Sequence, residues 1–145
     1  MARVEASVVI SRPVEEVFAF AANPENDSLW QTGGQDLGST YDGPMRVGAK
    51  AEGASQWLGR RYEWTSEVTE YEPNRKVKTE IALGPIVAKT STVFDPVEGG
   101  TKVTMAIEGE VGSFFRLAEP LVIRMIQRDV ESSLANLKDI LGAEA

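Results

Sequence analysis

The stretch VVISRPVEEVFAFAANPENDSLW, residues 8–30, decides the fold of this chain. Its first residues end a run in which every second side chain is apolar: Val4, Ala6, Val8 and Ile10. This period of two predicts a strand over about residues 3–11 with one apolar face. The Ser-Arg-Pro corner that follows should end the strand and start a helix, with Ser11 as its cap and Pro13 in its first turn.

Two short helices are expected after this corner. Asn23-Pro24 should end the first helix and start the second, which should carry Leu29 and Trp30 inward before Gly33-Gly34. Helices shorter than about a dozen residues are marginal in water on their own. Both helices must therefore pack against a larger structure.

The middle of the chain predicts a meander of strands. The junctions carry turn residues, as in Glu72-Pro73-Asn74 and Glu98-Gly99-Gly100, and short connections favour antiparallel neighbours. The strands expected after the two helices cover about residues 35–41, 45–54, 59–72, 75–83, 87–95 and 101–111.

Alternation along these strands assigns their two faces. The outer face is mostly charged, and Glu52 and Glu70 would face inward only if the register slipped by one residue. The inner face should hold Val47, Ala49, Ala51, Tyr62, Trp64, Ser66, Val68, Val77, Thr79, Ile81, Leu83, Ala88, Thr90, Thr92, Phe94, Val103, Met105, Ile107 and Gly109.

Residues 113–141 predict a long amphipathic helix, whose apolar side chains recur at steps of three and four: Ile123, Ile126, Val130, Leu134, Leu137 and Leu141. Its first half is apolar on most sides, with Phe114, Phe115, Leu117, Leu121, Val122, Met125 and neighbours. Pro120 lies inside it, so we expect a kink or a restart there. The crowded apolar residues either gate a pocket or meet another subunit, which would make the protein a homodimer.

Composition bounds the function. The chain has 145 residues, 42% of them hydrophobic and 26% charged, which is typical of one globular domain. The first ten residues lack the apolar core of a signal peptide, and no apolar run is long enough to span a bilayer, so we expect a cytoplasmic protein without membrane insertion. The net charge of -7 opposes binding to nucleic acid.

Cysteine and histidine are both absent. This removes thiolate nucleophiles and the side chains most used for acid–base catalysis and for transition metals. We therefore expect no metal and no cofactor, and we assign no catalytic residue. The only defensible donors for an enzymatic reaction are Tyr62, Arg124 and Gln127.

The order of one strand, two short helices, six strands and one long helix resembles the START-related superfamily of polyketide cyclases/dehydrases and lipid-transport proteins. The resemblance covers essentially the whole chain. Its marks are the stretch quoted above, DGPMRVGAK at residues 42–50, FDPVEGGTKVTM at 94–105 and LANLKDIL at 134–141. These are turns, caps and packing residues, so they indicate a fold more than a function.

The resemblance implies an α+β helix-grip fold. In that fold a curved antiparallel sheet of about seven strands wraps around the long C-terminal helix, and the two short helices close one edge. Residues 1–145 would then form a single START-like ligand-binding domain. A cavity is expected between sheet and helix, because many inner side chains are too small to fill it: Ala49, Ala51, Ser66, Ala88, Thr90 and Thr92.

The ligand-binding residues expected from this arrangement are Trp30, Tyr62, Trp64, Ser66, Thr79, Thr90, Thr92, Phe94, Met105, Phe114, Leu117, Leu121 and Met125. The aromatic and methionine side chains could equally be plain core, and the threonines could serve strand formation alone. Arg116, Arg124 and Arg128 share one helix face. They either form a solvated face with neighbouring acids, Asp129 among them, or turn one guanidinium toward a ligand carboxylate.

Three functions remain open. The first is binding or transport of a small hydrophobic ligand, such as a lipid, a sterol-like or a polyketide-like molecule. The second is a polyketide cyclase or dehydrase, and the third is a protein-interaction module. An enclosed cavity would favour the first two, and a filled interior would favour the third.

Overall fold

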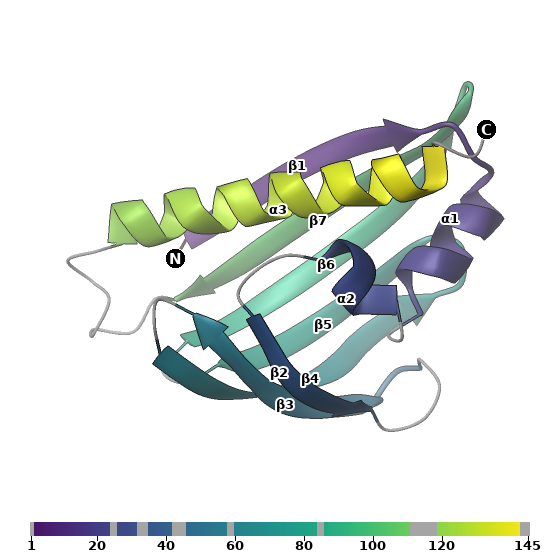
Figure 1. Cartoon of the computed structure of the whole chain (residues 1–145). Helices are drawn as coiled ribbons and strands as arrows, with labels where there is room; N and C mark the ends of the chain where they lie inside the picture. Colours follow the sequence, from purple (N-terminus) through teal and green to yellow (C-terminus); the bar gives the residue numbers. More distant parts are fainter. Residues whose placement is uncertain are drawn as a thin grey trace.

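The computed structural model of the protein describes residues 2–23, 26–31, 35–41, 46–57, 60–83, 86–110 and 119–142. Helices and strands are largely separated along the chain: six consecutive strands form the middle, and one long helix ends the chain (Figure 1). In chain order they are β1 Ala2–Ile10, α1 Val14–Ala21, α2 Asp27–Trp30, β2 Gln35–Tyr41, β3 Lys50–Trp57, β4 Arg60–Glu72, β5 Lys76–Leu83, β6 Ile86–Val97, β7 Gly100–Glu110 and α3 Glu119–Gly142.

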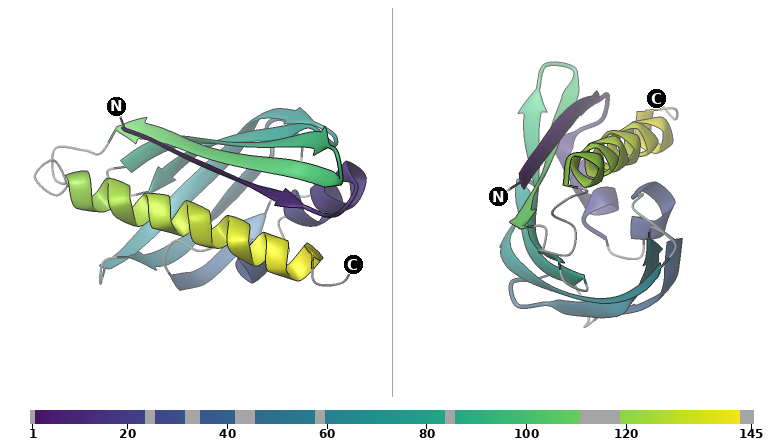
Figure 2. Two further views of the ribbon diagram at one scale, coloured as in Figure 1. Left: turned by 90° about the horizontal axis from the view of Figure 1, so that it is seen from above. Right: turned by 90° about the vertical axis from the view of Figure 1, so that its left-hand side faces the viewer.

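The strands form one antiparallel seven-stranded sheet in the order β1-β7-β6-β5-β4-β3-β2. Each strand from β2 to β6 pairs with the next strand along the chain, and β1 completes the sheet by pairing with β7. Seen along α3, the sheet curls around one side of the three helices (Figure 2, right). The α+β fold expected from the sequence is confirmed.

The register of the sheet confirms the predicted inner face. Ser66 lies opposite Ile81, Ile81 opposite Ala88, and Ala88 opposite Gly109, which makes one continuous row across β4 to β7. Directly opposed residues project from the same face of a sheet. The predicted inner residues of these strands therefore share one face, and that face is the concave one that holds α3 (Figure 2).

A bulge in β4 changes the faces near its end. The register between β4 and β5 shifts between Val68 and Glu70, and beyond it Tyr71 lies opposite the inner residue Val77. A bulge inserts one extra residue and so reverses the alternation that follows it. Tyr71 thereby turns inward, and its ring lies 5.7 Å from the ring of Phe18. Period-two alternation could not show this.

Glu70 lies on the outer face, as expected from the sequence, but it does so because of the bulge: strict alternation beyond Val68 would have turned it inward. Its carboxylate oxygens lie 3.3 Å from Lys76 Nζ and 3.2 Å from Lys78 Nζ. Hydrogen bonds from these two lysines lower the pKa of Glu70. The group is therefore part of an outer charge network between β4 and β5 and does not face α3.

Two predicted boundaries were wrong. The strand expected from residue 45 begins at Lys50, because residues 46–49 form a turn with Gly48 at φ +86°, and Val47 is exposed there. The first helix begins at Val14, since Pro13 is extended at φ −61°, ψ 150° and has no side-chain cap. Ser11 is therefore not its N-cap.

The remaining helix predictions were partly right. Trp30 is buried at the end of α2, but Leu29 is exposed. Because α3 starts at Glu119, Pro120 sits in its first turn, where a missing N–H breaks no helical hydrogen bond. The expected kink or restart near Pro120 depends on residues 113–118, which lie outside the described residues.

The packed core lies where α1, α2 and the second half of α3 meet β1, β6 and β7 (Figure 1). The ring centroids of Phe18 and Phe94 lie 5.1 Å apart in an edge-to-face contact. Arg12, from the Ser-Arg-Pro corner, donates from Nε to the carbonyl oxygen of Leu141 over 2.9 Å. The corner thus fixes the C-terminal end of α3, where a cation is also favoured by the helix dipole.

The described helices contain no stretch that is both long enough and apolar enough to cross a membrane.

Candidate ligand-binding site

The interior between sheet and helices has two different ends. At the end near α1 the inner side chains are fully buried: Phe94 is 1% exposed, and Val103 and Leu137 are not exposed at all. At the other end the inner side chains of β4 to β7 are only half-buried: Tyr62, Trp64, Ser66, Thr79, Ile81, Ala88, Thr90, Thr92 and Ile107. These side chains face α3, yet nothing in the described structure covers them completely.

The position of α3 explains this difference. The helix packs mainly on the edge strand β1, and more weakly on β7 and α2, so it lies to one side of the sheet rather than over its middle (Figure 2, right). Among the described residues α3 has no comparable packing on the middle strands β4 to β6, which carry small inner side chains such as Ser66 and Ala88. Partly accessible apolar surface on the concave face is the feature that a small ligand could cover.

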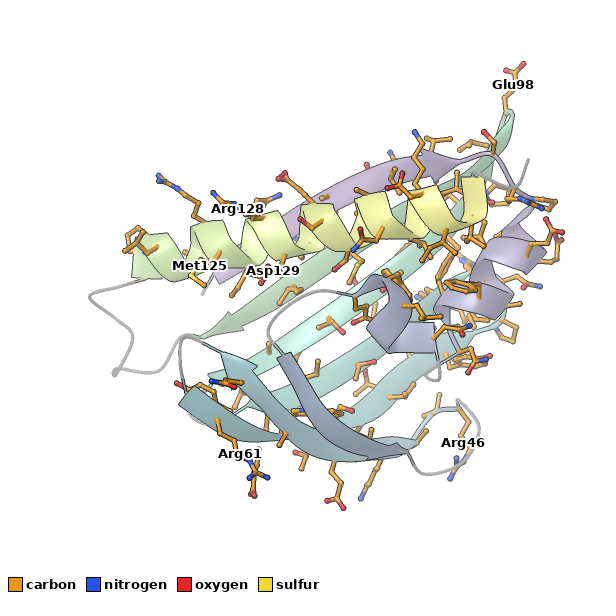
Figure 3. All side chains as sticks on the ribbon, viewed as in Figure 1. Arg46, Arg61, Glu98, Met125, Arg128 and Asp129 are labelled. Carbon is orange, nitrogen blue, oxygen red and sulfur yellow. The ribbon has the colours of Figure 1, made fainter. Side chains whose placement is uncertain are left out.

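One flank of α3 faces this surface. Met125 and Asp129 project from the side of α3 that looks toward the sheet, whereas Arg128 projects from the opposite side (Figure 3). Met125 and Asp129 are both half-buried. One turn further on, Ser133 is 2% exposed, and Asn136 donates from Nδ2 to the carbonyl oxygen of Trp30 over 3.2 Å, which fixes α2 against α3.

Asp129 is a half-buried carboxyl group that sequence reasoning did not select as a site residue. We expected it, among the neighbouring acids, on the solvated face of the helix. Burial raises the pKa of Asp129, and Arg128 opposes the shift with a smaller Coulombic effect. Its position on the helical wheel could have indicated this burial, because Asp129 is one turn from both Met125 and Ser133 and so lies beside the apolar stripe.

The packed end of the interior contains a buried hydrogen-bond donor, the indole N–H of Trp30. The indole Nε1–H of Trp30 is buried and has no hydrogen-bond partner within the described part of the chain. Such a group costs about 1–3 kcal/mol relative to a satisfied one. Trp30 is therefore held by the packing of its ring.

Trp30→Phe is expected to change the free energy of unfolding by less than about 1 kcal/mol, because the lost ring volume is offset by removal of an unsatisfied donor. Urea denaturation measures the difference. A loss above about 2 kcal/mol would instead show that the indole N–H is satisfied in solution.

Apart from Leu121, the predicted ligand-binding residues fall into three groups. Those on the half-buried inner surface are Tyr62, Trp64, Ser66, Thr79, Thr90 and Thr92, with Met125 facing them from α3. Those in the packed core are Trp30, Phe94 and Met105. Phe114 and Leu117 lie outside the described residues.

Three further expectations need correction. Leu121 is 64% exposed in the first turn of α3, and Arg124 is also exposed. Gln127 donates from Nε2 to the carbonyl oxygen of Glu5 over 3.2 Å, so it serves the contact between α3 and β1. Neither Arg124 nor Gln127 is placed to donate to a ligand on the inner face, and Tyr62 is the one of the three proposed donors that lies there.

A hollow of about 740 Å³ is lined mainly by residues of the outer face of the sheet, and it also borders Ala51, Ser66 and Ile81. Its outward-facing lining residues are Lys50, Glu52, Thr65, Glu67, Thr69, Glu80, Ala82 and Val87. Lys50 and Glu67 form an ion pair of 3.9 Å with both side chains well exposed. This is an open, charged surface with little to hold an apolar molecule. Among the described residues no group of His, Cys, Asp and Glu side chains could hold a metal ion.

The family assignment follows from the sequence as a whole. Residues 1–142 match the model of the polyketide cyclase / dehydrase and lipid transport family. The chain belongs to that family. A search of the curated proteins finds no match.

Several solved structures share the fold of this chain. TTHA0849 from Thermus thermophilus is 21% identical, with a TM-score of 0.80 over 99% of both chains. MLL2253 from Mesorhizobium loti is 17% identical, with a TM-score of 0.76 over 99% of both chains. DynU16, from the dynemicin biosynthetic locus, is 17% identical, with a TM-score of 0.69 over 96% of this chain and 46% of its own. At these identities the likeness is one of fold.

Membership of the polyketide cyclase / dehydrase and lipid transport family narrows the choice between the two faces. The family name covers both chemistry on polyketides and transport of lipids. The inner surface offers apolar and hydroxyl side chains, whereas the outer hollow offers carboxylates. The inner surface is therefore the better candidate site.

Proposed function

We propose that this protein binds a small hydrophobic ligand, such as a lipid, a sterol-like or a polyketide-like molecule, between the inner face of β4 to β7 and the first half of α3. The observation that carries the proposal is the half-buried state of inward-facing Tyr62, Trp64, Ile81 and Ala88 beside a fully buried core. In this proposal the whole chain is one ligand-binding domain that acts in the cytoplasm.

The physical basis is removal of apolar surface from water. Each Å² of apolar area covered contributes about 25 cal/mol, less the cost of association. The hydroxyl groups of Ser66, Thr79 and Thr90 lie within this surface and offer hydrogen bonds to a few polar atoms. Thr90 Oγ1 lies 3.5 Å from the carbonyl oxygen of Thr79, a contact long enough to be exchanged for one with a ligand. The surface thus suits a mainly apolar molecule.

The proposal predicts saturable binding of N-phenyl-1-naphthylamine, an uncharged apolar fluorophore. Its emission should rise on addition of protein and saturate at one molecule per chain. Mass spectrometry of small molecules extracted from protein purified under native conditions would then identify the natural ligand class. Fluorescence that grows linearly with protein, without saturation, would contradict a defined site.

A polyketide cyclase or dehydrase is the second candidate function, and Asp129 favours it. A carboxyl group whose pKa is raised by burial, on a ligand-facing surface, is suited to proton transfer. DynU16, with the same fold, comes from the dynemicin biosynthetic locus. Turnover of aromatic polyketide precursors, lost in Asp129→Asn while fluorophore binding survives, would select this function over simple binding.

A further inference from the structure

We propose that two copies of this chain associate through the exposed side of α3, with the two helices antiparallel and related by a two-fold axis. The proposal is independent of the ligand-binding function, because this side of the helix faces away from the sheet. We call its central line of side chains the outer stripe. The stripe follows alternating steps of three and four, which keep side chains on one line of a helix: Leu121, Arg124, Arg128, Glu131, Ala135 and Lys138.

The outer stripe is open to solvent. All of its residues are exposed, and Leu121 is 64% exposed. Arg128 projects from α3 on the side away from the sheet (Figure 3), and no described helix or strand lies beyond α3 on that side (Figure 2, right). The helix packs through its other side, mainly on β1 and more weakly on α2 and β7. The stripe is therefore accessible to a second protein surface.

The charges on this side of α3 are separated along the helix. Arg124 and Arg128 lie in its first half, one turn apart, where like charges repel. Glu131 and Asp139 lie in its second half, and Asp139 falls in the last turn, where the helix dipole disfavours an anion. None of these four side chains forms a salt bridge within the described part of the chain. A single copy thus leaves the pattern without ion-pair partners.

An antiparallel second copy supplies these partners, because it sets the first half of one helix beside the second half of the other. With the two-fold axis between residues 129 and 130, Arg128 of each copy lies opposite Glu131 of the other. Arg124 lies opposite Ala135, whose flanking residues one turn away are Glu131 and Asp139. Each contact occurs twice, as a two-fold interface requires.

The ends of the stripe fit the same arrangement. Lys138 of one copy lies opposite Leu121 of the other. The aliphatic part of a lysine side chain packs on an apolar neighbour while its ammonium group stays in water. The exposed leucine is therefore covered without placing Lys138 directly opposite an arginine.

A groove beside the stripe is placed to receive Arg124 of the second copy. It has a volume of about 200 Å³ and lies between β1 and α3. Ala135, Glu131 and Asp139 line it from α3, together with Lys138, and Ser7 lines it from β1. Its two carboxylates outnumber its one cation. A guanidinium presents five N–H donors in a fixed fork, which suits such a set of oxygen acceptors.

The size of the surface sets the expected strength. The 24 residues of α3 extend over about 36 Å, and a contact along one helix face falls at the low end of specific interfaces, below about 1,200 Å². Exposed ion pairs are individually weak and are screened by salt. We therefore expect a dimer that dissociates in the micromolar range or above and that weakens as sodium chloride is raised.

Charge reversal tests the arrangement by sedimentation equilibrium over a wide range of protein concentration. Arg128→Glu sets acid opposite acid, and Glu131→Arg sets base opposite base, at both symmetry-related contacts. Each variant alone should dimerise about tenfold or more weakly than the wild type. An equimolar mixture of the two variants should recover the dimer, because the new charge of each faces the opposite charge of the other.

The control is Lys89→Glu, which changes the net charge by the same amount as Arg128→Glu but at an exposed position on β6. It should dimerise like the wild type. Recovery in the mixture also shows that both α3 variants are folded, and both should bind N-phenyl-1-naphthylamine like the wild type. A wild type that stays monomeric at every concentration, a dimer that survives in each single variant, or a mixture that stays monomeric would overturn the proposal. None of these outcomes bears on the ligand site.

Discussion

Phe94→Ala is expected to lower the free energy of unfolding by about 3–5 kcal/mol. Phe94 is 1% exposed and packs edge-to-face on Phe18 at 5.1 Å between ring centroids. Deleting the ring removes its buried apolar area and leaves a cavity that the surrounding core cannot close. Such a loss is a large fraction of the roughly 5–15 kcal/mol that stabilises a typical domain.

Ile81→Ala is the matched control at the other end of the same inner face. Ile81 faces α3 from β5 but is only half-buried, so its truncation should cost below about 1.5 kcal/mol. Urea denaturation of both variants, with equal slopes, measures the difference. Equal losses at the two positions would mean that the interior is packed to the same density throughout, and the candidate site would lose its basis.

Most of the sheet could be predicted because successive side chains of a strand point to opposite faces, which follows directly from strand geometry. It placed Ser66, Ile81 and Ala88 on one face, and the register confirms that they are neighbours. Where one residue is inserted, the same rule fails. The bulge after Val68 turned Tyr71 inward, and nothing in the composition of that segment announces it.

The local errors have a common cause. Gly48 in a left-handed turn and extended Pro13 set the true starts of β3 and α1, a few residues later than the hydrophobic pattern suggested. Turn and cap geometry depends on the dihedral angles of one or two residues, whereas periodicity averages over many. Boundaries are therefore the part of the fold least accessible to pattern reasoning.

The site was harder to predict than the fold. The hydroxyl and aromatic side chains of the inner surface followed from alternation, but the role of α3 did not. The apolar stripe of α3 shows which side of the helix is most apolar. It does not show that this side packs on the edge strand β1, or that one flank of the helix then faces the middle of the sheet. Asp129 lies on that flank (Figure 3). The flank that faces the inner surface is set by tertiary packing, which the sequence pattern does not show. For this reason the sequence pointed to Arg124 and Gln127 instead.

Ala88→Leu should lower the affinity for N-phenyl-1-naphthylamine about tenfold or more while leaving stability nearly unchanged. Ala88 is half-buried on the inner face, between Ile81 and Gly109 in its row of the sheet. If ligand space lies above it, the larger side chain occupies that space and can cover the backbone at Gly109 without displacing any neighbour. Binding of the fluorophore would be lost because the apolar surface it needs is already covered.

Ala21→Leu is the same substitution in the packed core, where Ala21 of α1 is 7% exposed. There the added methyl groups have nowhere to go, and overpacking should cost about 1–3 kcal/mol. Urea denaturation and fluorophore titration of the two variants therefore separate an open site from a filled core. A loss of stability in Ala88→Leu as large as in Ala21→Leu, with fluorophore affinity retained, would place the ligand somewhere other than the inner face of β4 to β7.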